Sequence, residues 1–421
     1  MDKRIIAVFM LVFMVCSLGL VGCREPAADS GQKIPRPAEE VLESFDPVLA
    51  GATSGFGMKL LEKLCAEEEN VFISPVSIAT ALAMTYNGAR GETKEKMAAV
   101  LGVEGAELER LNDNNLAQLY LLQEADPSVK LQIANSLWGR DGIEFDAEFV
   151  DRNEKYYNAL LRELDFDSPA AAETINSWVK ECTGGLIEEI IEPPIDPLTI
   201  LFLINAIYFQ GDWSEPFDPE NTREDTFYLP AGGTKSIPLM HRSGEFDYYE
   251  NNDFQAVRIP YGEKERLAMY VFLPPQESGL QEFLGQWSAE GWKEQREQFQ
   301  QAEGDLYLPR FTMEYEKTLN DVLKALGMEV AFDQAQADFF DMVTWEGAPR
   351  LYISEVKHKA FIEVQEKGTE AAGATSVEVR VESAPAFWFT MKVDHPFFFL
   401  IEDEETDALL FMGAVSSPEL Q

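Results

Sequence analysis

The hydrophobic and polar positions of the chain change their spacing about a third of the way along the sequence. Residues 76–86 are apolar on nearly every side, which predicts a buried helix. Ser74-Pro75 is a typical helix start, because serine caps the first turn and proline fits within it. Asn87-Gly88 is expected to end this helix. Further helices are predicted at 92–101, 105–124, 146–160 and 170–181.

The rest of the chain carries short apolar runs with the length and composition of β-strands. They cover 131–138, 201–209, 256–260, 267–273, 305–308, 351–356, 360–364, 397–401 and 409–415, after an early strand at 70–73. One more helix is predicted at 317–326. Because helices come first and strands mostly follow, the pattern favours an α+β fold. Residues 45–420 contain no repeat or low-complexity block and are expected to form one domain.

Residues 369–382 combine the pattern of a strand with the composition of a loop. Alternate positions carry Thr, Ala, Gly, Thr, Val, Val and Val, and the positions between them carry Glu, Ala, Ala, Ser, Glu, Arg and Glu. A strand with one buried face shows this period of two. Residues 371–374 are nevertheless poor strand formers, and residues 383–385 are typical of a surface loop. The pattern alone leaves both interpretations open.

The first 22 residues have the features of a secretory signal. Lys3 and Arg4 precede an apolar run from Ile5 to Leu20. A transmembrane anchor is the alternative, since roughly 18 apolar residues can span a bilayer. Leu-Val-Gly-Cys at 20–23 favours processing, because it resembles the bacterial lipoprotein signal, in which the cysteine is lipidated and becomes the new N-terminus.

These features predict a signal at 1–22, then a lipidated Cys23 at the head of a flexible tether that extends to residue 44. The protein is therefore expected outside the cytoplasm, anchored by lipid to the cell envelope or surface of a bacterium or archaeon. The remaining cysteines, Cys65 and Cys182, are too few for a disulfide framework and are expected to be buried free thiols.

The chain is strongly acidic, with a formal net charge of −40 from 74 acidic and 34 basic residues. A surface of this charge repels nucleic acids and anionic headgroups, so polyanion binding is not expected. Residues 105–124 carry more acidic than basic side chains.

The sequence also argues against catalysis. His241, His358 and His395 lack a His or Cys partner at metal-ligand spacing. Ser177 and Lys180 match the Ser-x-x-Lys motif of acyl-transferring hydrolases, but the Ser-Asp-Asn and Lys-Thr-Gly companion motifs are missing from the sequence. We therefore predict that the protein is not an enzyme and uses no metal or cofactor.

Seven short motifs, in a common order and spacing, resemble the serpin family over about residues 45–420. They are NVFISPVSI at 70–78, TYNGARGET at 85–93, LINAIYFQGDW at 203–213, LPRF at 308–311, HKAFIEV at 358–364, DHPFFF at 394–399 and FMG at 411–413. The resemblance implies a fold of three β-sheets and eight or nine helices, with an exposed reactive loop near the C-terminus.

The resemblance also implies a mechanism. A target serine endopeptidase, or a cysteine one, attacks the loop as a substrate and forms an acyl-enzyme. The cut loop then inserts into the main sheet as an extra strand and traps the protease, so that the inhibitor is a suicide substrate; this is an established case of strand addition and stored strain. The alternative is a non-inhibitory serpin-fold protein that serves as a binding module or chaperone.

The reactive loop can be matched to the family residue by residue. Its hinge corresponds to Glu366, Gly368, Thr369, Glu370, Ala371, Ala372, Gly373, Ala374 and Thr375. Small or apolar residues alternate along it, as burial in a sheet requires, because burying a charge costs several kcal/mol. Counting seventeen residues from Glu366 places the cleaved bond at Glu382-Ser383 and suggests a protease that cuts after acidic residues. Arg380-Val381 is the alternative bond and implies a trypsin-like protease.

Five further positions resemble structural residues of the family. Trp213 matches the tryptophan near the point where the loop inserts. A polar cluster beneath the sheet is matched by Ser74, Ser77, Asn205 and His358. Ordinary core packing would also explain these five residues. Activation by heparin-like polyanions is not expected, because residues 105–124 lack the excess of basic side chains found in heparin-activated members. We also expect the protein to be a monomer.

Overall fold

The computed structural model describes residues 34–66, 70–277, 279–344, 350–369 and 388–420. The predicted signal and Cys23 lie outside the described residues. So do the hinge from Glu370 onward and both candidate cleavage bonds. Within the described part of the chain, none of the helices combines the length and the apolarity needed to cross a membrane.

Ten α-helices occur among the described residues. They are α1 (Glu39–Glu43), α2 (Pro47–Cys65), α3 (Pro75–Tyr86), α4 (Gly91–Leu101), α5 (Leu108–Gln123), α6 (Ala147–Tyr157), α7 (Ala171–Cys182), α8 (Gly279–Gly285), α9 (Ala289–Arg296) and α10 (Asn320–Leu323). Helix α3 is buried along its whole length, and the side chain of Ser74 caps it by accepting a hydrogen bond from the amide of Ser77.

The helix predicted at 317–326 begins later in the structure, because a strand continues to Thr318. Helix α10 covers Asn320–Leu323 and continues directly into a π-helical turn at Lys324–Met328. The chain then kinks at Gly327, whose φ of 114° is in the left-handed region that favours glycine.

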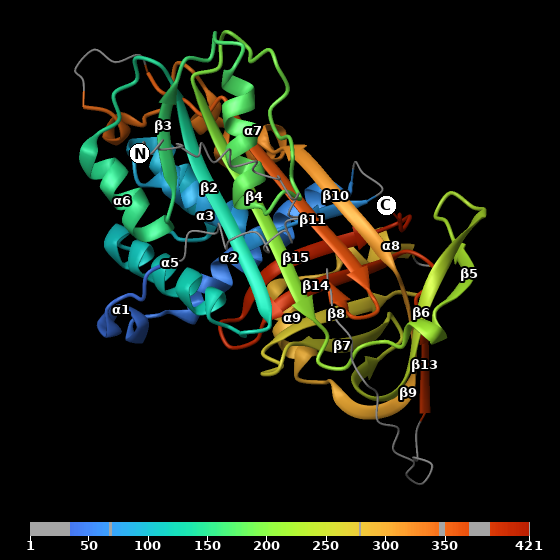
Figure 1. Ribbon diagram of the computed structural model, residues 1–421. Coiled ribbons are helices and arrows are strands. Elements are labelled where there is room, and N and C mark those ends of the chain that lie inside the picture. The colour runs from blue at the N-terminus through green and yellow to red at the C-terminus, as the bar shows by residue number, and fades with distance from the viewer. Residues whose placement is uncertain (1–33, 67–69, 278, 345–349, 370–387, 421) are drawn as a thin grey trace, which may run out of the picture. The chain divides into compact units, whose positions relative to one another are not determined.

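One sheet has six strands, in the order β10-β11-β12-β4-β2-β3 (Figure 1). These strands are β10 (Phe311–Thr318), β11 (Glu355–Gln365), β12 (Gly368–Thr369), β4 (Leu201–Asp212), β2 (Val129–Arg140) and β3 (Leu160–Leu164). Helix α7 lies in front of β2 and β4 (Figure 1), where Ile175 and Val179 pack against Phe202 and Ile204. Helix α3 lies on the opposite side, where Asn205 contacts Ser77.

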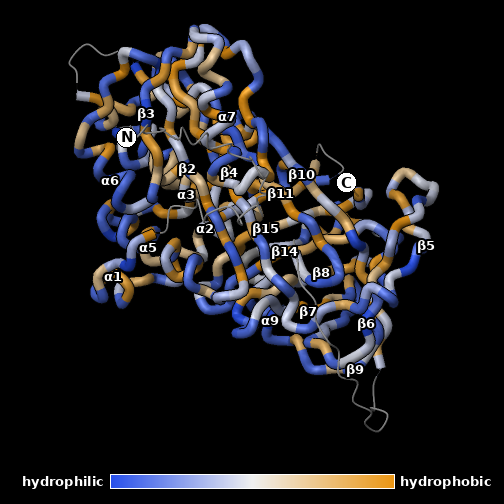
Figure 2. The backbone as a smooth tube through the Cα atoms, viewed as in Figure 1, coloured by the Kyte–Doolittle hydropathy of each residue, from blue (hydrophilic) through white to orange (hydrophobic). Residues whose placement is uncertain are grey.

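The other sheet has nine strands, in the order β1-β15-β14-β8-β7-β6-β9-β13, with β5 paired to β6. They are β1 (Val71–Ile73), β15 (Ala408–Val415), β14 (Phe397–Asp403), β8 (Leu267–Leu273), β7 (Gln255–Tyr261), β6 (Thr234–Glu250), β9 (Gln300–Pro309), β13 (Trp388–Lys392) and β5 (Arg223–Tyr228). Every residue of β8, β14 and β15 is buried, and these strands are hydrophobic except for Glu402 and Asp403 at the end of β14 (Figure 2).

The predicted α+β fold is confirmed, with one difference in how the strands are grouped. The resemblance implied three sheets, whereas hydrogen bonds join the described strands into two. The reason is β6, a strand of 17 residues that pairs with β5, β9 and β7 along successive parts of its length. The helix count exceeds the expected eight or nine because it includes α1 and α10, which have only five and four residues.

Candidate functional site

Strands β4 and β11 are direct neighbours along one part of their length and are separated at one end. They pair in parallel from Phe202 opposite Glu355 to Tyr208 opposite Phe361. Further along, β12 lies between them, and its Thr369 pairs with residues of both strands. The six-stranded sheet is therefore parted towards the C-terminal ends of β4 and β11, and the first hinge residues occupy the gap. We call the boundary between β4 and β11 the seam.

Thr369 is held firmly in the parted end of the seam. Its side chain is completely buried, and its hydroxyl lies 2.8 Å from the hydroxyl of Tyr261. Burial raises the pKa of the Tyr261 phenol well above its usual value, so the phenol is neutral. The ring of Tyr261 stacks on Trp213, with 4.3 Å between the ring centroids. The Trp213 indole donates a hydrogen bond of 3.0 Å to the carbonyl of Gln365, so Trp213 lies at the turn between β11 and β12.

Two other hinge residues are fixed by close contacts. A Cβ atom at Gly368 would lie 2.1 Å from the carbonyl oxygen of Gly211, so only glycine fits at this position. The carboxylate of Glu366 accepts a hydrogen bond of 2.8 Å from the hydroxyl of Thr222 and lies 3.9 Å from the guanidinium of Arg310. The start of the hinge is thus packed against β4 at Gly211 and is bound, through Glu366, to Thr222 and Arg310.

A buried polar cluster joins β4 to β11 where the two strands pair directly. Asn205 lies opposite His358, and its side-chain oxygen is 2.7 Å from Nδ1 of the imidazole. The amide nitrogen of Asn205 donates to Asn135 on β2 at 2.7 Å and to the carbonyl of Ser77 at 2.9 Å. The backbone amide of Ser74 donates to Nε2 of His358 at 3.4 Å. The structure therefore brings the four sequence-derived residues together and adds Asn135.

The imidazole of His358 is neutral in this cluster. Complete burial lowers the pKa of His358 to about 3, because the charged form loses its hydration. Since Nε2 accepts a hydrogen bond from Ser74, the ring proton is on Nδ1, which donates to Asn205. The side-chain link across the seam is thus a neutral hydrogen bond.

Ser177 and Lys180, the residues that match a hydrolase motif, are not arranged as a catalytic pair. Ser177 and Lys180 are exposed on α7, and the Lys180 ammonium pairs with Glu188 at 2.6 Å. A catalytic lysine needs a lowered pKa, which burial and not an exposed ion pair provides. The two cysteines, both predicted to be buried, differ in the structure, since Cys65 is buried whereas Cys182 is only partly buried. Across the residues that the structure describes, no group of three potential metal ligands is arranged to hold an ion.

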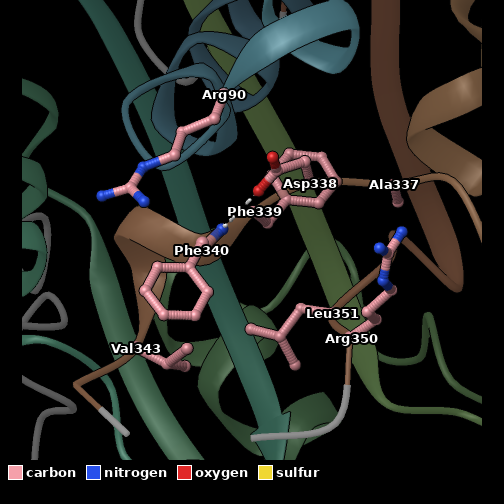
Figure 3. Close-up of a pocket in the computed structure, with 8 residues that line it drawn as sticks. All are labelled: Arg90, Ala337, Asp338, Phe339, Phe340, Val343, Arg350 and Leu351. Carbon is pink, nitrogen blue, oxygen red and sulfur yellow. Dashed lines mark hydrogen bonds between the residues drawn. The ribbon is translucent and has the colours of Figure 1, made fainter. Parts of the chain in front are cut away.

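A pocket is lined in part by Arg350 and Leu351, which precede β11 in the sequence (Figure 3). Its lining includes Arg90, Phe340, Arg350 and Leu351. Arg90 forms an ion pair with Asp341 and lies over the ring of Phe340 at 5.0 Å from the centroid. The pocket therefore combines apolar side chains with two arginines and one acidic residue, Asp338.

Comparisons with known proteins agree with this arrangement. Residues 51–418 match the family model described as serpin (serine protease inhibitor). The chain is 38% identical to an uncharacterised serpin-like protein of Thermococcus kodakarensis, over 93% of this chain and 91% of that protein. Human neuroserpin is 35% identical over 84% of this chain and 87% of its own length. Among solved structures, the native thermophilic serpin tengpin superimposes with a TM-score of 0.80 and 30% identity, covering 92% of this chain and 96% of tengpin.

Proposed function

The chain belongs to the serpin family, and we propose that it is an inhibitory serpin that traps its target endopeptidase as a suicide substrate. In this proposal, the protease attacks the loop at 370–387 and forms an acyl-enzyme. The loop then inserts between β4 and β11 before the acyl bond is hydrolysed. The observation that carries the proposal is the position of β12, since two hinge residues already lie between these strands.

The register of β12 predicts where each later loop residue would lie after insertion. Thr369 pairs with Gly211 on β4 and with Val364 on β11, antiparallel to both. Each further loop residue would therefore lie one residue earlier on both neighbours. Six residues beyond Thr369, Thr375 would lie opposite Asn205 and His358.

Insertion must break the hydrogen bond between Asn205 and His358. Neighbouring strands lie about 4.8 Å apart, so a strand placed between β4 and β11 would roughly double their separation. The break would leave a buried acceptor on Asn205 and a buried donor on His358, at a cost of about 1–3 kcal/mol each. The hydroxyl of Thr375 can donate to the first and accept from the second. The loop thus carries a suitable residue at the predicted position.

The rest of the loop is also compatible with insertion. In the same register, residues that alternate with Thr369 would face the buried side, and these are Ala371, Gly373, Thr375, Val377, Val379 and Val381. The charged side chains of Glu378, Arg380 and Glu382 would face the opposite side. None of the inward positions would place a charge in the sheet.

Protease trapping tests this proposal directly. The mature chain is incubated with a glutamyl-specific, a trypsin-like and an elastase-like protease, and we expect an SDS-stable complex with at least one of them. Sequencing the released C-terminal peptide then identifies the bond. A start at Ser383 supports cleavage after Glu382, and a start at Val381 supports a trypsin-like target instead.

Cleavage by all three proteases without a complex at any ratio would favour the non-inhibitory alternative. That alternative has some support, because human thyroxine-binding globulin, solved with thyroxine, matches the fold with a TM-score of 0.81 and 26% identity over 90% of this chain and all of that chain. For this chain it predicts cleavage of the loop without any trapped protease.

We propose further that the protein acts outside the cytoplasm as a monomer, anchored by lipid on Cys23. The support is the Leu-Val-Gly-Cys motif at 20–23. Cys23→Ser is expected to move the protein from the detergent phase to the aqueous phase in a detergent partition experiment. Equal partition of both proteins would contradict the anchor.

A further inference from the structure

Strand β13 begins at Trp388, directly after the predicted reactive loop, and presents one face to solvent. It pairs in parallel with β9, which pairs antiparallel with β6. Residues opposite each other in a sheet point to the same side, and alternate residues share a face. We define the β13 face as the nine side chains of His241, Ser243, Glu245, Glu303, Asp305, Tyr307, Trp388, Thr390 and Lys392. All nine are exposed or partly exposed.

Trp388 is held in place although its side chain is half exposed. The residue is 49% exposed, and its indole nitrogen donates a hydrogen bond of 3.0 Å to Asp305. Asp305 also accepts hydrogen bonds from Ser243 and from His241, the latter at 2.9 Å. Partial burial raises the pKa of Asp305, but these three hydrogen bonds outweigh it, so the pKa lies below its usual value. The carboxylate therefore stays ionised and orients the indole.

The backbone of β13 is anchored from the buried side. Phe389 is only 2% exposed and stacks on Tyr248, with 4.0 Å between the ring centroids. A Cβ atom on the facing Gly304 would lie 2.3 Å from the ring of Phe389, so the strand fits tightly against β9. Trp388 is thus a large apolar side chain on a fixed strand, with one surface open to a partner.

The distance along the chain identifies that partner. Trp388 follows Ser383 by five residues, which span about 17 Å when fully extended. A standard protein interface covers about 800 Å² on each partner, equivalent to a patch with a radius of about 16 Å. A protease that attacks the Glu382-Ser383 bond must therefore lie within reach of Trp388, on the side of the leaving group.

We propose that the β13 face is a docking surface for the target protease, which Trp388 contacts on the leaving-group side of the cleaved bond. This inference rests on the proposed inhibitory function and adds the type of protease that is preferred. Of the nine side chains, Glu245, Glu303 and Asp305 are acidic. Lys392 is neutralised by Asp225 at 2.9 Å. The face therefore favours a protease with basic side chains beside its active site, which can also bind the indole ring.

The test compares association rates. Wild type, Trp388→Ala, Trp388→Phe and the control Phe340→Ala are mixed with the glutamyl-specific protease. Phe340 is a matched control, because it is 47% exposed but lines the pocket of Figure 3. We expect Trp388→Ala to lower the second-order rate constant at least tenfold and Trp388→Phe to lower it less, with no change in the thermal midpoint. An unchanged rate for Trp388→Ala, or an equal loss in Phe340→Ala, would overturn the proposal.

The charge preference is tested by ionic strength. The rate for wild type is expected to fall as salt rises, and the double variant Glu245→Gln/Glu303→Gln should show a weaker salt dependence. Identical salt dependence of the two proteins would overturn the preference for a basic protease.

Docking can be measured without trapping by using a protease whose catalytic serine is replaced by alanine. This protease binds the loop but cannot cleave it, so its equilibrium affinity reports docking alone. We expect Trp388→Ala to bind it at least tenfold more weakly than wild type does. Equal affinities would contradict the docking surface even if wild type forms a covalent complex with the active enzyme. Weaker binding by Trp388→Ala, without any covalent complex from wild type, would instead contradict the inhibitory mechanism alone.

Discussion

The two sheets bury their interiors with different chemistry. In the nine-stranded sheet, β8, β14 and β15 pair antiparallel without a gap and are buried at every residue. In the six-stranded sheet, the seam between β4 and β11 is parallel, is parted at one end by β12 and is joined midway by a polar cluster. Apolar packing depends on a close fit of shapes, which an additional strand would disrupt. Hydrogen bonds across the seam can be exchanged for bonds to an incoming strand, so under the proposed mechanism the loop would insert at the seam.

The largest expected effect comes from a charge at the parted end of the seam. Thr369→Arg would place a guanidinium beside the buried Tyr261, at a cost of several kcal/mol. We expect the variant to be cleaved as a substrate and to form no SDS-stable complex. Glu370→Arg is the control, because this position is predicted to face outward and should still allow trapping. Undiminished inhibition by Thr369→Arg would show that the predicted register is wrong.

A cavity made in the nine-stranded sheet should destabilise the uncleaved and the cleaved protein equally. Phe399 is fully buried, and a Cβ atom on the neighbouring Gly413 would lie 2.2 Å from its ring. Phe399→Ala is expected to lower the free energy of unfolding by about 3–5 kcal/mol. Denaturant unfolding before and after loop cleavage should show similar losses, since this sheet is not expected to rearrange. A loss confined to one form would mean that both sheets change on cleavage.

Removal of one hydroxyl should affect only the cleaved form. Thr375→Val keeps the shape of the side chain but leaves Asn205 and His358 unpaired after insertion, which costs about 1–3 kcal/mol for each group. We expect a lower thermal midpoint for the cleaved variant and an unchanged midpoint for the uncleaved one. Thr375→Ser retains the hydroxyl and should behave more like wild type. If Val and Ser variants are equally stable after cleavage, Thr375 does not reach the polar cluster.

Acid should weaken the polar cluster through His358. Its folded pKa of about 3 is below the unfolded value of about 6.5, so only the unfolded chain takes up a proton between these values. The full stability is present above pH 6.5 and is lost progressively as the pH falls towards 3. At pH 5 the free energy of unfolding is lower by about 2 kcal/mol. Denaturant unfolding at pH 7 and pH 5 measures this loss. His358→Gln should lose less between the two pH values, and an equal loss would assign it to other groups.

The parts of the fold that could be predicted from sequence are those with a continuous apolar signal. Helix α3 and strands β14 and β15 fall in this class, because nearly all of their positions are buried. Strands β3, β5, β6, β10 and β13 were missed, since about half or more of their residues are exposed or partly exposed and their apolar residues do not form a long run. The two-residue β12 has no local signal at all, because it depends on the gap between β4 and β11.

The candidate site shows a similar division. Ser74, Ser77, Asn205 and His358 were selected by resemblance to the serpin family, and the structure places them in one cluster. Asn135 was missed, although it lies in a correctly predicted strand. Its role follows from the register of β2 against β4, and a register depends on tertiary packing that sequence patterns do not specify.

The smallest expected effect concerns the end of the seam beside the pocket. In the register of β12, Glu382 would lie opposite Leu198 and Leu351, thirteen residues beyond Thr369. Leu351 lines the pocket next to the exposed Arg350 (Figure 3). Cleavage and hydrolysis after Glu382 would bring two carboxylates to this arginine, and an exposed ion pair contributes less than about 1 kcal/mol.

Arg350→Gln is therefore expected to lower the thermal midpoint of the cleaved form slightly at low salt and to leave the uncleaved form unchanged. Arg350→Lys keeps the charge and should match wild type. The difference should vanish near 1 M salt, where charges are screened over about 3 Å. If the protease instead cuts at Arg380-Val381, the new carboxylate would stop two residues short of Leu351, and Arg350→Gln would have no effect. This variant thus reports independently on which bond is cut, because its readout depends only on where the inserted strand ends.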